Sequence, residues 1–356
     1  MTCRQVHRLW WSQSWRWVIG LMAVLIVIGM GAAVKTTQGH QQGLQQTSQM
    51  KAYQASDYRK HPENYQLHGH QVSLAEYNTE QYQFFSKNQF KVHGYETRIG
   101  VTGNNWYYLF MMIAGLVFAF WGRRTHYAEF MLGLGATRNQ LFLVQLGQAL
   151  ALTLTVAVAQ LIYWGWVIAV IPEKYQAYRN LAGLFGSNAA IVAISFGMLV
   201  LGWFVGLLNN RFWLATILSG LSWRFLEGVG SESGYAMLLF GDNVLPVGFW
   251  FYAHYYVASS LVLGLSILAC GAIWQLQRTW SAELTPFGGE TLFRKVGLIG
   301  VVTIAGGAIL GDIFLQPFIP GVLPWFEILG MAILLVVLLL GLTIQKQRSK
   351  GVQHGA

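Results

Sequence analysis

Charged residues are scarce in this sequence. Asp, Glu, Lys and Arg make up 10% of its 356 residues, whereas hydrophobic residues make up 54%. Soluble domains are about 25% charged, so a chain of this length could not cover a water-exposed surface with so few charges. The scarcity excludes a soluble globular protein and indicates a protein that lies in a membrane.

Cysteine and the common catalytic motifs are also missing or rare. Cys3 and Cys270 are too few and too far apart for a disulfide framework or a thiolate metal site. The sequence contains no GxxxxGK[ST] phosphate loop, no HExxH, no CxxC and no Gly-x-Ser-x-Gly elbow. We interpret His61, His68 and His70 as polar residues of a solvated loop rather than metal ligands. The sequence therefore predicts no metal, no bound cofactor and no enzymatic activity of its own.

Long apolar runs are abundant. A helix needs about 20 residues to cross a bilayer, and helices and closed barrels are the structures that satisfy their backbone polar groups in lipid. The runs are continuous rather than alternating, which favours helices. We predict an all-α integral membrane protein of the cell membrane, with transmembrane helices at 16–34, 105–122, 141–171, 187–208, 212–229, 252–275, 295–313 and 323–344, eight in all.

The basic residues predict the orientation. Cytoplasmic segments of multispanning proteins are enriched in Lys and Arg. With both termini inside, the short outer loops carry only Lys174 and Arg179. The net charge of +9 therefore reflects orientation and contact with membrane lipids, and nucleic acid is not an expected partner. The inner side holds Arg4, Arg8, Arg16, Arg123, Arg124, Arg138, Arg211, Arg278, Arg294, Lys295, Lys346, Arg348 and Lys350.

A small outer domain is predicted between the first two spans, over residues 35–104. Within it, Ser73 and Glu76 have the spacing of a capping box, which predicts a helix from there to about Phe85. The segments outside the spans also include a cytoplasmic amphipathic helix (1–15), a cytoplasmic loop (276–294) and a cytoplasmic tail (345–356).

Two features stand out among spans three to six, residues 141–275. Arg224 and Glu227 are three residues apart in the fifth span, so they share a helix face and form a candidate intramembrane ion pair. Residues 235–250 are apolar but interrupted by Gly, Asp and Pro. We interpret them as a re-entrant or outer-leaflet piece, because irregular backbone at membrane depth must be buried in protein.

The most informative segment is the predicted cytoplasmic stretch 123–140. Thr137 and Gln140 have capping-box spacing, so a helix is expected to begin near Arg138. From there to Ile171 this helix would be about 50 Å long, against a hydrocarbon core of about 30 Å. Its first turns should therefore project into the cytoplasm.

A second, shorter helix is expected just before it, at 127–134. Glu129 lies in its first turn, where the helix dipole favours a carboxylate. Gly133 and Gly135 let the backbone turn sharply, and Arg138 is placed to reach an acidic partner or a lipid phosphate. A short helix, a glycine break and a projecting helix make a docking element; the alternative is an ordinary interfacial loop.

The stretch Glu129-Phe-Met-Leu-Gly-Leu-Gly-Ala-Thr-Arg138 resembles the first cytoplasmic loop of ABC-2 type transporter permeases. In that family an acidic residue opens a short helix, and a small-residue and Arg step leads into the third span. The likeness covers roughly residues 1–275, including the basic aromatic helix from Arg4 to Trp17. The family usually has Pro where Gly135 stands, and six spans rather than eight.

The resemblance implies a function. In that family the loop contacts a separate ATP-binding subunit, so Glu129, Gly133, Gly135 and Arg138 would couple ATP hydrolysis to transport. The chain would be the permease subunit of an ABC exporter, with ATP bound by a partner chain and a second permease copy or homologue completing the pathway. One alternative is an FtsX/MacB-like mechanotransmitting ABC permease, which the Leu-Gly-Ala step also resembles. The other is a membrane-embedded sensor or enzyme that uses the outer loop 35–104; the substrate stays open.

Overall fold

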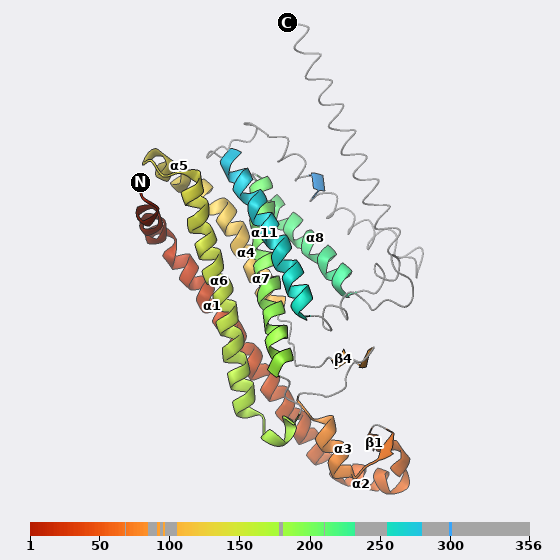
Figure 1. The fold of residues 1–356 in the computed structure, drawn as a ribbon. Coiled ribbons are helices and arrows are strands. Elements are labelled where there is room, and N and C mark those ends of the chain that lie inside the picture. The colour runs from red at the N-terminus through yellow and green to blue at the C-terminus, as the bar shows by residue number, and fades with distance from the viewer. Residues whose placement is uncertain are drawn as a thin grey trace.

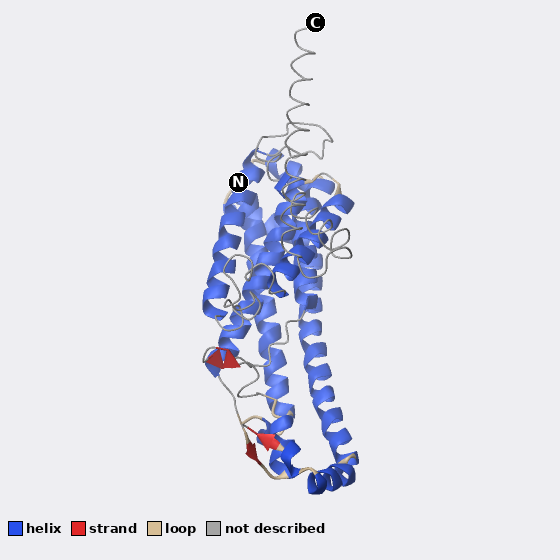
Figure 2. Cartoon of the chain, turned by 90° about the vertical axis from the view of Figure 1, so that its right-hand side faces the viewer, coloured by secondary structure: helices blue, strands red, loops and turns tan. Residues whose placement is uncertain are grey.

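The fold is a bundle of long helices with two very short antiparallel strand pairs (Figures 1 and 2). The computed structural model describes residues 1–67, 69–84, 91–92, 95–96, 105–177, 181–209, 211–231, 255–279 and 299–300. The helices are α1 (Cys3–Gln49), α2 (Lys51–Lys60), η1 (Pro62–Asn64), α3 (Leu74–Gln81), α4 (Asn105–Arg124), α5 (Tyr127–Gly133), α6 (Arg138–Val170), η2 (Glu173–Tyr175), α7 (Leu181–Leu208), α8 (Phe212–Ser231) and α11 (Tyr255–Thr279). The strands are β1 (Gln66–Leu67), β2 (His70–Gln71), β3 (Lys91–Val92) and β4 (Tyr95–Glu96).

Five of the described helices, α1, α4, α6, α7 and α11, are long and apolar enough to cross a membrane. The protein is therefore a predominantly α-helical, membrane-embedded protein. Helices also occupy the predicted spans 105–122, 141–171, 187–208, 212–229 and 252–275, with shifts at their ends. The last two predicted spans and the piece at 235–250 lie outside the described residues.

The first helix differs from its prediction. We expected a cytoplasmic helix at 1–15, a span at 16–34 and then a loop, but α1 is one continuous helix of 47 residues, about 70 Å long. Its polar C-terminal part stays helical because it packs on residues that follow α3. His40 Nε2 is 3.0 Å from the carbonyl oxygen of Tyr82, and Leu44 packs against a buried cluster at this end. These tertiary contacts are not visible in the local sequence.

Helix α1 packs along α6, and the two run in the same direction (Figure 1). Near its start, Trp10 Nε1 donates to Gln148 Oε1 at 3.3 Å. Further along, Gly29 permits close approach, because an added Cβ would lie 2.9 Å from the carbonyl oxygen of Ala159. The buried residues on this side of α1 are Val6, Trp10, Ser14, Val18, Leu25, Gly29, Ala33 and Thr37.

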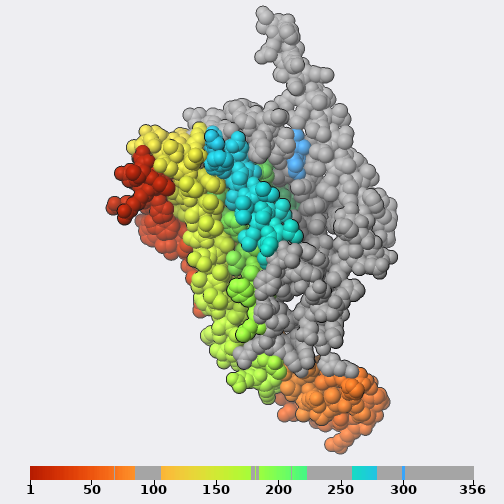
Figure 3. Space-filling view, viewed as in Figure 1, coloured from red at the N-terminus to blue at the C-terminus, as the bar shows by residue number. Residues whose placement is uncertain are grey.

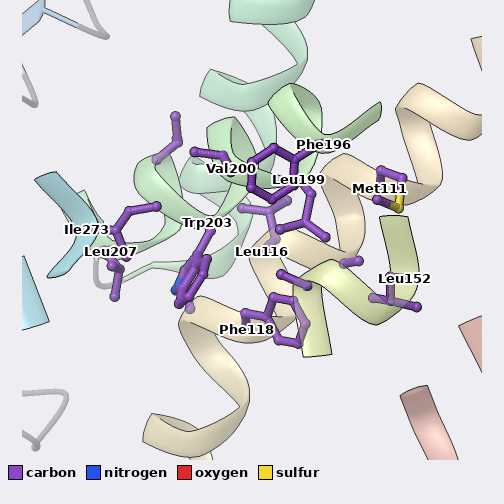
Figure 4. Close-up of a cluster of buried hydrophobic side chains, with 14 of the residues drawn as sticks. Met111, Leu116, Phe118, Leu152, Phe196, Leu199, Val200, Trp203, Leu207 and Ile273 are labelled. Atoms are coloured by element: carbon purple, nitrogen blue, oxygen red, sulfur yellow. The ribbon is translucent and has the colours of Figure 1, made fainter. Parts of the chain in front are cut away.

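Helices α4 and α7 approach most closely in the centre of the bundle. A Cβ added to Gly115 would overlap the carbonyl oxygen of Leu199, and one added to Gly202 would overlap that of Met112. Small residues let helix backbones pack closely in lipid, where no hydrophobic force drives association. The surrounding core (Figure 4) includes Met111, Leu116, Phe118, Leu152, Phe196, Leu199, Val200, Trp203, Leu207 and Ile273.

The two ends of the bundle differ. The end that carries α5, the start of α1 and the last turns of α4, α7 and α11 is called the α5 end; the opposite one is the α3 end (Figure 1). At the α3 end, α2, α3 and the β1–β2 pair form a small lobe at the tip of α1, the orange region of Figure 3. Ser73 caps α3 as predicted, accepting from the Glu76 amide at 3.2 Å. The helix ends at Gln81, earlier than expected, because Phe84 N donates to the Tyr175 carbonyl at 2.8 Å.

Candidate functional site

The short helix predicted in segment 123–140 is α5, and its C-terminus is a Schellman motif. The amide of Ala136 donates to the carbonyl of Met131 at 3.0 Å, and the amide of Gly135 donates to Leu132 at 3.0 Å. Gly135 has φ +86°, a left-handed conformation that L side chains adopt at a cost. Ala136 and Met131 also share one buried cluster. Gly135 is therefore a backbone requirement of the turn between α5 and α6.

Gly133 has no such role, and our expectation that it shapes the turn is wrong. It is the last residue of α5 and its φ is not positive. An added Cβ would meet nothing within 4 Å. Of these two glycines only Gly135 makes the turn, because Gly133 still belongs to α5 and only Gly135 has a positive φ.

Glu129 lies in the first turn of α5, as predicted. Its Oε2 is 3.2 Å from Nδ1 of His126, the N-cap residue. His126 itself has φ +54°, in the left-handed region. Glu129 is partly buried, with its Oε1 enclosed, and His126 is exposed.

Tyr127 fixes α5 to α1. Its hydroxyl donates to the carbonyl of Leu9 at 2.8 Å, and burial raises the pKa of this phenol, which favours the protonated, donating form. Its ring also packs against Trp10 and Trp121, with centroid distances of 5.6 and 5.7 Å. The start of α1 and the short helix therefore form one packed unit at the α5 end.

Arg138 begins α6, and Thr137 caps the helix with the predicted capping box. The sequence suggested an acidic partner or a lipid phosphate for Arg138, which stays a prediction; its Nη1 donates to the Gln277 carbonyl of α11 at 3.1 Å. The side chain of Gln277 donates to Gln145 Oε1 at 2.8 Å, and Gln145 donates to the Phe118 carbonyl at 3.4 Å. This chain of hydrogen bonds joins α6, α11 and α4.

Arg123, near the end of α4, joins this helix to the end of α7. Its side chain is almost fully buried, with 1% exposed. Its Nη1 donates to the carbonyls of Gly206 and Asn209, at 3.5 and 3.4 Å. The last carbonyls of a helix lack intrahelical donors and carry partial negative charge, so Arg123 stabilises the end of α7 and anchors the end of α4 beside it. Hydrogen bonds therefore hold α5 to α1, the start of α6 to α11, and the end of α4 to the end of α7.

Two large apolar side chains in and just after α5 are exposed. Phe130 is 55% exposed and Leu134 is 48% exposed, although their neighbours Ala128 and Met131 are buried. The sequence analysis singled out the charged and glycine residues and missed these two. Helical spacing relates the two, because residues four apart are neighbours on one side of a helix.

The remaining predicted site residues have no structural account. The side chains of Arg224 and Glu227 lie outside the described part of the chain, although both positions belong to α8; their ion pair stays a prediction. Among the described residues, no three His, Cys, Asp or Glu side chains gather in a group that could hold a metal ion. His61 lies 3.1 Å from Glu63, and His68 is outside the described residues.

No protein-family model, no curated protein and no solved structure matches the chain.

Proposed function

We propose that the chain is the permease subunit of an ABC exporter in the cell membrane. In this proposal the chain has eight spans and cytoplasmic termini, and ATP is bound and hydrolysed by a separate ATP-binding cassette subunit. A second permease copy or homologue completes the pathway. The resemblance of residues 129–138 to the cytoplasmic loop of ABC-2 type permeases is the starting point, and the geometry of α5 is what supports it.

The observation that carries the proposal is that α5 is a short, firmly held helix with an apolar outer face. The Schellman turn at Gly135 and the Tyr127–Leu9 hydrogen bond fix its ends, while Phe130 and Leu134 stay exposed. Exposed aromatic side chains on a rigid element are typical anchors of protein interfaces. Such an element suits a surface that receives force from a partner.

The contacts of the α5 end give a route for that force. A displacement of α5 acts on α1 through Tyr127 and Leu9. Through the turn at Gly135 it also acts on the start of α6, where Arg138 is bonded to Gln277 of α11. These are among the helices that cross the membrane, so a push on α5 would shift them together. On this proposal, the bundle alternates between two arrangements as the partner closes on ATP and opens again. The substrate class is left open.

The continuous α1 favours one variant of this function. It links the α5 end directly to the lobe of α2 and α3, over 47 residues. A rigid rod between a motor contact and an outer lobe suits a mechanotransmitting permease of the FtsX/MacB-like kind. The two candidates differ in what crosses the membrane: an exporter moves substrate through the bundle, whereas a mechanotransmitter moves only the lobe. Uptake of a substrate into inverted vesicles that depends on ATP would favour the exporter.

Affinity purification of the full chain from its native membrane, in mild detergent, tests the partner. We expect a subunit with a phosphate loop to co-purify with the wild-type chain and with Gly133→Ala. Phe130→Glu places a charge on the exposed side of α5, where the Phe130 ring stacks on that of Tyr127 with centroids 5.7 Å apart, and should lower recovery of that subunit at least about tenfold, as loss of an interface anchor does. Equal recovery with Phe130→Glu, or no such subunit with the wild type, would contradict the proposal.

A further inference from the structure

The side of α1 that faces away from the bundle carries a second feature at the α5 end. Trp10 and Ser14 are buried against the other helices. Arg4, Arg8 and Trp15 are exposed, and their spacing of four and seven residues places them on one face of the helix, opposite the buried side. Trp15 is 42% exposed despite its size. This face of α1 therefore exposes two guanidinium groups and an indole ring.

Helix α6 sets the depth of this face in the membrane. Its exposed apolar side runs from Leu143 to Trp166, about 35 Å, close to a hydrocarbon core of about 30 Å. Gln148 Nε2 donates to Ser14 Oγ at 2.6 Å, so Leu143, five residues earlier, is level with about residue 9 of α1. Arg8 then lies at the edge of the hydrocarbon core.

Arg4 lies about 6 Å further out than Arg8, within a headgroup layer about 5–7 Å thick on each side. Trp15 lies about 10 Å further in than Arg8 along the helix, so its exposed ring is level with the acyl chains. The two arginines therefore lie at headgroup depth and the indole lies below them.

Most described charges at this end are positive. Helix α1 contains no Asp or Glu. Among the side chains that the structure describes at the α5 end, Glu129 is the single carboxylate, whereas the bases there are all arginines, apart from histidines and the terminal amine. An arginine guanidinium matches a phosphate with two parallel hydrogen bonds, which a lysine ammonium does not. The face is therefore complementary to the phosphates of negatively charged lipids.

We propose that Arg4, Arg8 and Trp15 form a lipid-binding face, the arginine stripe, that selects anionic phospholipid headgroups in the leaflet at the α5 end. The phosphate lies between the guanidinium groups of Arg4 and Arg8, and the acyl chains follow the apolar surface of α1 beyond Trp15. This proposal requires only that α1 crosses a membrane. It does not depend on the ATP-binding partner.

The experiment uses the full chain reconstituted in nanodiscs of phosphatidylcholine and phosphatidylglycerol at equal amounts, with matched acyl chains. After extraction into detergent, the retained lipids are counted by mass spectrometry. We expect the wild type to retain phosphatidylglycerol preferentially. Each basic residue near an anionic surface changes binding about fivefold, so R4Q/R8Q should lower the preference at least about tenfold, and R4K/R8K by less.

The control is R59Q/K60Q, which removes the same charge from exposed residues at the end of α2, in the lobe at the α3 end, and should keep the wild-type preference. Glycerol 3-phosphate in excess should not displace the retained lipid; displacement would mean that the site binds free phosphate esters, which would overturn the proposal. Equal retention of both lipids by the wild type, an unchanged preference in R4Q/R8Q, or an equal loss in the control would also overturn it.

Discussion

At the scale of single residues, Gly133 and Gly135 show how two neighbouring glycines differ. Both looked alike in the sequence, where each suggested a sharp turn. Only Gly135 has a positive φ, and Gly133 stands in open space at the end of a helix. The sequence showed that a glycine break was present, but the position of the helix end, set by the Met131–Ala136 hydrogen bond, decides which glycine makes it.

Alanine at each of these positions separates their roles. G135A forces a side chain into the left-handed region and should lower the free energy of unfolding by about 1–2 kcal/mol. G133A should be neutral or stabilise by up to about 1 kcal/mol, because alanine favours a helix more than glycine. Thermal unfolding in detergent measures both, with hydrogen exchange at α5 to locate the change. Equal melting temperatures for the two variants would refute the assignment of the turn to Gly135.

At the scale of helices and their contacts, the sequence predicted where helices begin, but it did not predict features that depend on contacts between distant residues. The capping boxes at Thr137 and the cap at Ser73 mark real helix starts, because capping is decided within four residues of chain. The continuation of α1 to Gln49 was not predicted, since it depends on contacts with Tyr82, which is far away in the sequence. Likewise, the exposed face of α5 became visible only once its buried side was known.

The crossing of α4 and α7 makes a prediction at this scale. Gly202 lies where an added Cβ would overlap the Met112 carbonyl, whereas Gly264 on α11 has nothing within 4 Å. G202A should overpack the crossing and destabilise the protein by about 1–3 kcal/mol, seen as a lower melting temperature and less monodisperse protein on size exclusion. G264A, the matched control in a second membrane helix, should behave as wild type. Comparable loss in both variants would mean that any helical alanine is harmful and the crossing is not special.

At the scale of the whole molecule, α1 offers a direct test of orientation. Cys3 and Gln46 are both exposed and lie at opposite ends of one helix, about 65 Å apart, so the proposed span of α1 puts them on opposite sides of the membrane. The proposed orientation, taken from the distribution of basic residues, has Cys3 in the cytoplasm. In intact cells, an impermeant thiol reagent should label Q46C in a C3S/C270S background and should leave native Cys3 unlabelled in a C270S chain. Labelling of Cys3, with Q46C protected, would reverse the proposed topology. If neither site is labelled, the same labelling in opened cells shows whether the reagent can reach the two thiols.

The proposed function also belongs to this scale, because it concerns how the bundle moves as a unit. Composition alone was enough to place the chain in a membrane, since too few charges exist to cover a soluble surface. The partner was suggested by the stretch from Glu129 to Arg138. In the structure, Phe130 and Leu134 are exposed near this stretch, while Arg138 donates a hydrogen bond to α11. A side chain's availability depends on what packs around it, which the linear sequence does not state.

The central claim is tested most directly by ATP hydrolysis in proteoliposomes that hold the chain together with its co-purified ATP-binding subunit. We predict that the subunit hydrolyses ATP faster with the wild-type chain than alone, that G133A keeps this stimulation, and that F130E lowers it at least about tenfold while still inserting and folding normally. The same stimulation with F130E as with the wild type, or none with either, would contradict the account of α5 as the element that couples a partner ATPase to the membrane helices.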